Sequence, residues 1–423
     1  MKIISKAKLF VGLVLFGSFV TSCSKDGEPV VEEKPVVSDN VSGEVSGTWK
    51  KGNTYKVTGH LEIPAGKSLT VEEGVTILMS NSTLKPEIIV KGNLYLLGTG
   101  SNPVKVTVPE ELKTTANQWG ALWGGIIAAS TSSEIVINNS EINYGGAVTT
   151  EASPSVKAGL YKAAAGEHVP FLYYSNTAGK LVVTNSTISH FNEDGMYIEG
   201  GNVIIAKNKF YTTGEAGGES VNLKSGVIAD VAFNLMYSPN TNAMKLSNSG
   251  ERSPQLHIVG YNNTVINAGW RRPTAKGGSL WVEKAAYAEL YNNLLVNSRY
   301  GIKRDKGNPE DNRSKFTNTF YYGSTETGVL QFQPNTEIIA GTNDVISTVV
   351  AANDPQFESY PLNTDNLNAV FNTSWDFHLK STSPALNKGK TDFTPNFVNG
   401  LVVNGVTYKS PAPANYIGAY STK

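Results

Sequence analysis

The segments YNNTVIN at residues 261–267 and YNNLLVN at residues 291–297 decide the fold. Each places asparagines before a short run of residues that favour β-strands. Related segments recur at intervals of 23, 26, 29, 30 and 25 residues, measured between Asn185, Asn208, Asn234, Asn263, Asn293 and Asn318. A strand-rich repeat of this length, without helical periodicity, is typical of a solenoid in which each coil buries its core against its neighbours.

Asparagine suits the turns of such a solenoid for a physical reason. It adopts the left-handed backbone conformation at modest cost, and its amide can hydrogen-bond to the asparagine of the next coil. We therefore expect an all-β parallel β-helix with stacked asparagines at one turn of each coil.

Composition limits the classes of partner. The 423 residues include 36 Lys and Arg and 36 Asp and Glu, so the formal net charge is zero. This balance gives no overall attraction to nucleic acid or to an anionic membrane. The single cysteine excludes internal disulfides and multi-cysteine zinc sites.

The N-terminus predicts export. In residues 1–22, lysines precede an apolar run at residues 9–20 that is too short for a membrane-spanning helix, as in a secretory signal. VTSC at residues 20–23 resembles a bacterial lipobox, which implies lipidation of Cys23. SKDGE at residues 24–28 resembles the export signal of Bacteroidetes surface lipoproteins, which implies display on the outer membrane with the lipid anchor as the membrane contact. The composition that follows predicts a disordered tether over residues 23–46.

Both ends of the folded region carry a family resemblance. Short strands punctuated by glycine between residues 55 and 126, with DPQF at 354–357 and IGAY at 417–420, resemble secreted parallel β-helix proteins of Bacteroidetes. The resemblance implies a right-handed, pectate-lyase-like β-helix over residues 47–353. The repeat lapses at residues 147–179, which predicts an insertion. Residues 354–423 are expected to cap the open end, because an exposed coil would offer an unpaired edge.

Alternation within the predicted strands defines an outward face. For example, Val221 and Leu223 are expected to point inward, and Asn222 outward. Neighbouring coils lie about 4.8 Å apart, so outward side chains form adjacent rows. The residues assigned to this face are Tyr197, Asn222, Lys224, Lys245, Trp281, Glu283, Lys303 and Gln331.

The predicted face suits a polysaccharide, because its polar groups can bond sugar hydroxyls and its aromatic rings can contact apolar sugar faces. Its cations favour an acidic polysaccharide, although any β-helix also needs polar outward residues. The segment of Trp270, Arg271 and Arg272 lies between coils. It is expected either to overhang the face as a clamp or to pack on the coil.

One motif points to catalysis. ESVNLKS at residues 219–225 resembles the Glu and Lys-Ser motif of the chondroitinase B and alginate lyase family. The resemblance implies Glu219 as a calcium ligand and Lys224 as the base, with Lys245 and Arg304 as further catalytic candidates. Gly217 stands where that family has a second acidic ligand, and no arginine occurs at the matching place on the next coil.

Other catalytic patterns are weaker. RRPTAK at residues 271–276 is one residue short of the pectate lyase pattern RxPxxR. His190 and His257 show no acid partner in the sequence and are expected to be turn or core residues.

The favoured hypothesis is a surface lipoprotein that binds polysaccharide on the predicted face. Two alternatives stay open: a calcium-dependent lyase acting on a uronic-acid glycan, and a non-catalytic structural or adhesive protein that contacts other proteins through residues 147–179. Calcium dependence separates them, because the lyase should need the ion and sugar binding should survive chelation.

Overall fold

The computed structural model describes residues 35–162, 164–274, 277–363 and 365–423. The predicted signal and Cys23 lie outside these ranges, so lipid anchoring stays a prediction. None of the helices in the described ranges is both long enough and apolar enough to cross a bilayer.

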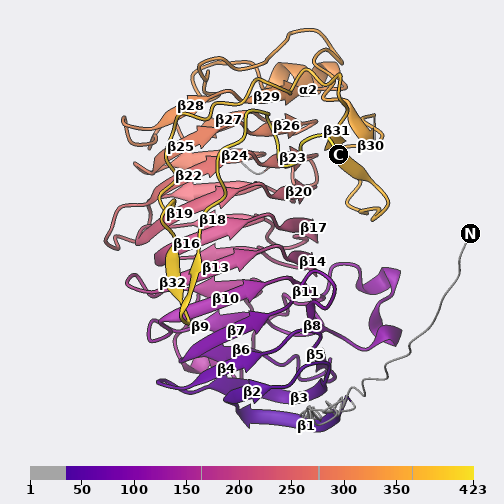
Figure 1. The fold of residues 1–423 in the computed structure, drawn as a ribbon, viewed down its shortest axis with the longest axis vertical. Coiled ribbons are helices and arrows are strands. Elements are labelled where there is room, and N and C mark those ends of the chain that lie inside the picture. The colour runs from indigo at the N-terminus through magenta and orange to yellow at the C-terminus, as the bar shows by residue number, and fades with distance from the viewer. Residues whose placement is uncertain (1–34, 163, 275–276, 364) are drawn as a thin grey trace, which may run out of the picture. The chain divides into compact units, whose positions relative to one another are not determined.

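The described chain forms a parallel β-solenoid, which confirms the predicted fold class (Figure 1). In each regular coil, a strand of a ten-stranded sheet leads through a tight asparagine turn to a strand of what we call the ladder-side column. A loop then leads to a strand of the face column, and the next coil begins. Both columns belong to one 19-stranded sheet, because the long strand β3 (Thr54–Ile63) pairs in both.

The ten-stranded sheet consists of β2 (Gly47–Trp49), β4 (Ser68–Val71), β7 (Asn93–Leu97), β10 (Glu134–Asn138), β13 (Lys180–Thr184), β16 (Gly201–Ala206), β19 (Val227–Ala232), β22 (His257–Tyr261), β25 (Tyr287–Tyr291) and β28 (Lys315–Thr317). The ladder-side column consists of β1 (Val37–Glu44), β3, β5 (Thr76–Met79), β8 (Val104–Thr107), β11 (Ser140–Asn143), β14 (Thr187–Phe191), β17 (Lys209–Thr213), β20 (Leu235–Tyr237), β23 (Thr264–Ile266), β26 (Leu294–Val296) and β29 (Phe320–Tyr322). The face column continues from β3 through β6 (Ile88–Val90), β9 (Ile126–Ala128), β12 (Leu172–Tyr174), β15 (Met196–Ile198), β18 (Val221–Leu223), β21 (Met244–Ser247), β24 (Leu280–Glu283) and β27 (Ile302–Arg304). Two 3₁₀ turns, η1 (Glu110–Leu112) and η2 (Thr115–Asn117), follow β8.

Amide stacking at the asparagine turns is confirmed in four coils, whereas Ser186 and Thr319 take the ladder position in the coils of Asn185 and Asn318. Asn208 Nδ2 donates to Asn234 Oδ1, Asn234 Nδ2 to Asn263 Oδ1, and Asn263 Nδ2 to Asn293 Oδ1, each at 3.0 Å. All four side chains are buried. The ladder therefore satisfies buried amides from coil to coil without water.

The left-handed backbone lies one residue before the ladder position. Asparagine occupies this left-handed position at Asn262 and Asn292, where φ is 50° and 55°. In two other coils the same position is occupied by Lys207 and Phe233. The two properties for which asparagine was expected are thus divided between successive residues, and the YNN segments supply both.

The predicted inward residues fill the core. Val221, Leu223, Met244 and Leu246 have no exposed surface. The inward assignment fails after Arg304, because residues around Gln331 form α2 (Glu326–Gln331) instead of a strand.

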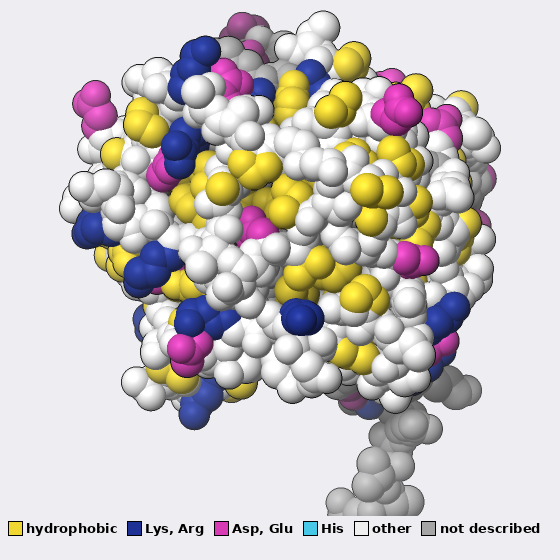
Figure 2. Space-filling view, turned by 90° about the horizontal axis from the view of Figure 1, so that it is seen from above, with side chains coloured by type: hydrophobic (Ala, Val, Ile, Leu, Met, Phe, Trp, Pro, Cys, Tyr) yellow, Lys and Arg dark blue, Asp and Glu magenta, His cyan; other side chains and the backbone are white. Residues whose placement is uncertain are grey.

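The segment around α2 closes the C-terminal end of the core. Phe332 packs on Tyr321, with ring centroids 5.3 Å apart, while Leu330 points to solvent. Figure 2 looks down on this end, where apolar side chains are interspersed with polar and charged groups. The prediction that residues 354–423 form the cap is therefore wrong.

Residues 354–423 instead lie along the sides of the solenoid (Figure 1). The hairpin of β30 (Phe357–Ser359) and β31 (Asp376–Leu379) covers apolar outward residues of the ladder-side column. The hairpin of β32 (Leu401–Val403) and β33 (Val406–Tyr408) packs against the ten-stranded sheet.

Two other predicted boundaries change. The tether was expected to run to residue 46, but β1 pairs with β3 as the first coil strand. The insertion was expected over residues 147–179, but β12 is a regular strand of the face column. The excursion contains the short helix α1 (Pro154–Lys157) and returns to the solenoid before β12.

Candidate functional site

The predicted face forms a continuous column of side chains. Five predicted outward residues occupy paired positions on successive strands from β15 to β27: Tyr197, Asn222, Lys245, Trp281 and Lys303. The sequence alternation therefore assigned their register correctly.

Much of this column is buried, which the alternation did not show. Asn222 is 3% exposed, Trp281 5% and Lys303 8%. At one end, Tyr161 from the insertion packs edge-on against Tyr197, with ring centroids 5.2 Å apart. At the other end, the Lys303 ammonium lies 3.9 Å from the Tyr300 ring centroid. A ligand therefore cannot lie along all five coils.

The accessible part is a cleft of about 290 Å³ near the middle of the column. We call it the face cleft, and its lining residues are Glu219, Thr241, Asn242, Lys245, Arg272, Gly277, Trp281 and Glu283. Five of these were predicted site residues that are distant in sequence. Lys303 lies 5.7 Å from the Trp281 ring centroid, so Trp281 forms part of the floor and does not present an open ring.

Beside the face cleft lies a buried acidic cluster that the sequence argument missed. Asp194 belongs to the coil before Glu219, and its Oδ1 accepts hydrogen bonds from the backbone N–H groups of Gly218 and Glu219 at 3.0 and 2.9 Å. Its Oδ2 accepts from Asn222 Nδ2 at 3.0 Å. Asp194 therefore holds the turn that presents Glu219 to the cleft.

Glu193 occupies the space beside Gly217. A Cβ on residue 217 would lie 2.3 Å from the Glu193 carboxyl carbon, so a side chain there would have to displace the end of Glu193. The second acid expected at position 217 thus comes from the neighbouring coil. The repeat interval of about 25 residues was the signal that could have found it, because it places residues 193 and 194 beside residue 219.

Both glutamates resist ionisation. Burial, together with the negative charge of Asp194, raises the pKa of Glu193 to about 8 and that of Glu219 to about 8. Their carboxyls are therefore largely neutral at physiological pH. Lys245 Nζ lies 4.0 Å from Glu219 Oε1, at the limit of an ion pair.

Lys224 directly follows β18, two residues beyond Asn222 of the column, and is 7% exposed. Its ammonium lies 5.2 Å from the Tyr197 ring centroid. Burial, reinforced by the nearby charge of Lys245, lowers the pKa of Lys224 to about 8. A lysine of this kind can accept a proton near neutral pH, but Lys224 does not line the face cleft.

The acidic cluster does not fit calcium. Calcium binds about six to eight oxygen atoms, and those oxygens must not already be engaged in hydrogen bonds that turn them away from the ion. Both Asp194 oxygens accept N–H groups, and Glu219 Oε1 accepts Asn242 Nδ2 at 3.2 Å. Within the described ranges, no three His, Cys, Asp or Glu residues are grouped so as to hold a metal ion. The oxygens of Asp194 and Glu219 thus do not support the predicted calcium role of Glu219.

The three side chains at residues 270–272 have different surroundings: two bond to neighbouring coils and one lines the face cleft. Trp270 Nε1 donates to Asn297 O at 2.6 Å, and Arg271 donates to the carbonyls of Gly214 and Ser238 at 2.6 and 2.7 Å. These two side chains brace neighbouring coils, in agreement with the packing alternative. Arg272 is exposed and lines the face cleft.

Two predicted site residues lie elsewhere. Arg304 is paired with Glu310, away from the lining of the face cleft. Gln331 ends α2 and has no place in the outward column, so its assignment to the face is wrong. The strand pattern was misread there because the solenoid had already ended.

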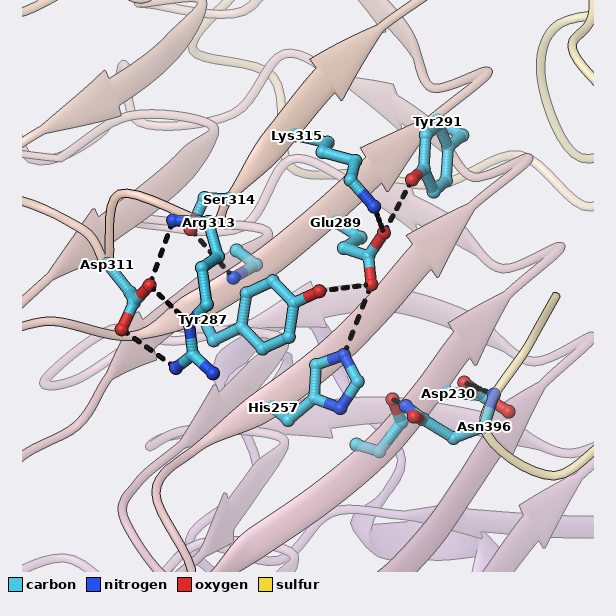
Figure 3. A network of polar contacts seen from close by, with 12 residues as sticks. Asp230, His257, Tyr287, Glu289, Tyr291, Asp311, Arg313, Ser314, Lys315 and Asn396 are labelled. Atoms are coloured by element: carbon cyan, nitrogen blue, oxygen red, sulfur yellow. Dashed lines mark hydrogen bonds and ion pairs between the residues drawn. The ribbon is translucent and has the colours of Figure 1, made fainter. Parts of the chain in front are cut away.

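A second polar network lies on the ten-stranded sheet (Figure 3). Glu289 accepts hydrogen bonds from Tyr287, Tyr291 and Lys315 at 2.7 to 2.9 Å and contacts His257 at 3.3 Å. Burial opposes ionisation of Glu289, but hydrogen bonds led by that of Lys315 lower its pKa to about 2. His257 thus has an acid partner, contrary to expectation, in a network that joins three coils.

Comparison with known proteins supports the fold. Residues 41–159 match a family described as pectate-lyase like beta helix domain. These residues are therefore similar to a pectate-lyase-like β-helix domain, in agreement with the parallel β-solenoid that the structure shows. The match ends before the acidic cluster and the face cleft. Comparisons with curated proteins and with solved structures gave no match.

Proposed function

We propose that the face cleft binds a short stretch, or the end, of an acidic polysaccharide. The observation that carries the proposal is the meeting of Lys245 and Arg272 in a cleft beside two glutamates whose raised pKa keeps them neutral. Lys245 and Arg272 offer charge attraction, and the neutral carboxyls offer hydrogen bonds, to a uronate or sulfated sugar, while Glu283 is a further carboxyl of the lining. The column is covered at both ends, which favours a short bound segment.

Removing the cleft cations is the direct test. Binding of polygalacturonate, alginate and chondroitin sulfate is measured by calorimetry for the parent protein and for Arg272→Ala and Lys245→Ala. We expect each variant to bind about tenfold more weakly, because each loses a charge-assisted contact. Lys67→Ala removes an exposed lysine far from the cleft and should leave the affinity unchanged. Retention of full affinity in the Arg272 and Lys245 variants would contradict the proposal.

Acidic glycan binding should weaken as pH rises through about 8. Below that pH, Glu193 and Glu219 are neutral and Lys224 is charged; above it, both carboxyls become anionic and Lys224 loses its proton. All three changes make the site more negative. We expect the affinity for acidic polysaccharide to fall at least about tenfold between pH values of about 6 and about 9. Glu219→Gln should flatten this dependence, and a flat profile in the parent protein would count against the proposal.

A polysaccharide lyase is the second candidate, favoured by one observation: the lowered pKa of Lys224. A lyase base removes the proton beside the uronate carboxyl, a carbon–carbon double bond forms as the carbon–oxygen bond to the leaving sugar breaks, and that oxygen takes a proton from water, which leaves an unsaturated uronate. Rising ultraviolet absorbance that disappears in Lys224→Ala would support this reaction. Polysaccharide binding without formation of the unsaturated product would indicate a binding protein and not a lyase. The adhesive alternative would require that the polysaccharides not bind at all.

A further inference from the structure

A second cleft lies on the ladder-side column, outside the predicted face. Its volume is about 590 Å³, roughly twice that of the face cleft. Its floor is formed by outward side chains of β11, β14 and β17, and its wall by residues 371–378 in the loop before β31 and at the start of that strand. Residues 371–378 thus stand beside coils from which they are separated by more than 150 residues of sequence.

The floor consists of two ordered rows. Glu141, Thr187 and Lys209 are paired neighbours on successive strands, and two residues further along each strand lie Asn143, Ser189 and Tyr211. The three strands span two spacings, or about 10 Å. The first row therefore offers polar groups at a regular repeat along the solenoid axis, whereas Ser189 in the second row is only 2% exposed.

The wall is held in place by aromatic packing. Phe371 stacks on Tyr211 of the floor, with ring centroids 4.3 Å apart and planes at 12°. Trp375 packs edge-on against Tyr360 at 5.1 Å and remains partly exposed toward the cleft. Asn372 Oδ1 accepts from Ser374 N at 2.9 Å, which fixes the turn between the two rings. The cleft is thus formed before any ligand binds, and little entropy is lost on binding.

The charges of the lining are nearly balanced. Asp376 bonds His378 and Lys423, each at 2.6 Å, and Glu141 lies 4.0 Å from Lys105. Most of the other lining groups are hydroxyls, amides and aromatic rings: Asn143, Thr187, Ser189, Tyr211, Thr373, Ser374, Trp375 and Tyr420. This combination bonds sugar hydroxyls and packs on apolar sugar faces, and it gives no strong selection for a charged ligand.

We propose that this cleft is a separate binding site for a short neutral oligosaccharide lying across β11, β14 and β17. The sugar hydroxyls would bond the floor residues, and Trp375 and Tyr420 would contact its apolar faces. The site is independent of the face cleft, because the two clefts share no lining residue and lie on different strand columns.

The test fills the cleft without touching the core. Thr187 points outward from β14, so Thr187→Trp should block the floor. Calorimetric titration of the protein with xylohexaose, mannohexaose, cellohexaose and maltohexaose should find a ligand among these neutral sugars. We expect Thr187→Trp to weaken its binding at least about tenfold, and Thr187→Ser to have little effect because it keeps the hydroxyl and leaves the cleft open. Should Thr187→Trp fail to fold, Thr373→Trp on the exposed loop obstructs the same cleft.

Lys245→Ala distinguishes the two clefts. It should lower affinity for acidic polysaccharide and leave neutral oligosaccharide binding unchanged. The proposal is overturned if none of the four sugars binds, if binding survives the blocking variant, or if Lys245→Ala abolishes neutral sugar binding. Each of these outcomes leaves the proposed function of the face cleft to be judged on acidic polysaccharides alone.

Discussion

Leu223→Asp is expected to lower the free energy of unfolding by about 4 kcal/mol or more. Leu223 has no exposed surface and is paired with Ile198 on one coil and Leu246 on the next. Aspartate there would leave an unpaired charge and a cavity in the stacked core. Because each coil is stabilised by its neighbours, the damage should spread to adjacent coils and lower the melting temperature measured by circular dichroism.

Lys209→Asp provides the matched control. Lys209 is exposed on β17, the strand that precedes β18 in the same coil, so the same carboxylate remains in water. We expect a change within about 0.5 kcal/mol. Equal melting temperatures for the two variants would show that β18 does not have the register described above.

Asn234→Ala should cost roughly 3 kcal/mol. The Asn234 amide donates to Ile205 O and Asn263 Oδ1, and its Oδ1 accepts from the backbone N–H and the side chain of Asn208, all at 3.0 Å. Alanine removes these bonds and leaves the buried Asn208 N–H without its acceptor. Chemical unfolding followed by intrinsic fluorescence measures the loss.

Asn185→Gly separates the ladder from the turn conformation. Asn185 is exposed and has a left-handed backbone, with φ of 51°, which glycine adopts without strain. We expect little change in stability. A large loss here would mean that the Asn185 side chain, whose Nδ2 donates to Asn138 Oδ1 at 3.1 Å, contributes more than the turn conformation.

Some features of the candidate site could be predicted from the sequence because they are local. Strand alternation placed Asn222, Lys245 and Trp281 in one column, and this register follows from the period of two along each strand. The acidic cluster could not be found in the same way, because Asp194 and Glu219 belong to different coils. Their proximity depends on the length of each loop, which varies from coil to coil.

The sequence by itself determined the solenoid, the asparagine ladder and the inward core, because each coil repeats one local pattern and contacts only its neighbours. Only the tertiary structure decided which outward residues remain accessible. Tyr161 from the insertion covers one end of the face column, and the segment before β31 builds the wall of the second cleft. These contacts join segments far apart in the chain and depend on shape complementarity between loops and coils, for which no periodic pattern exists.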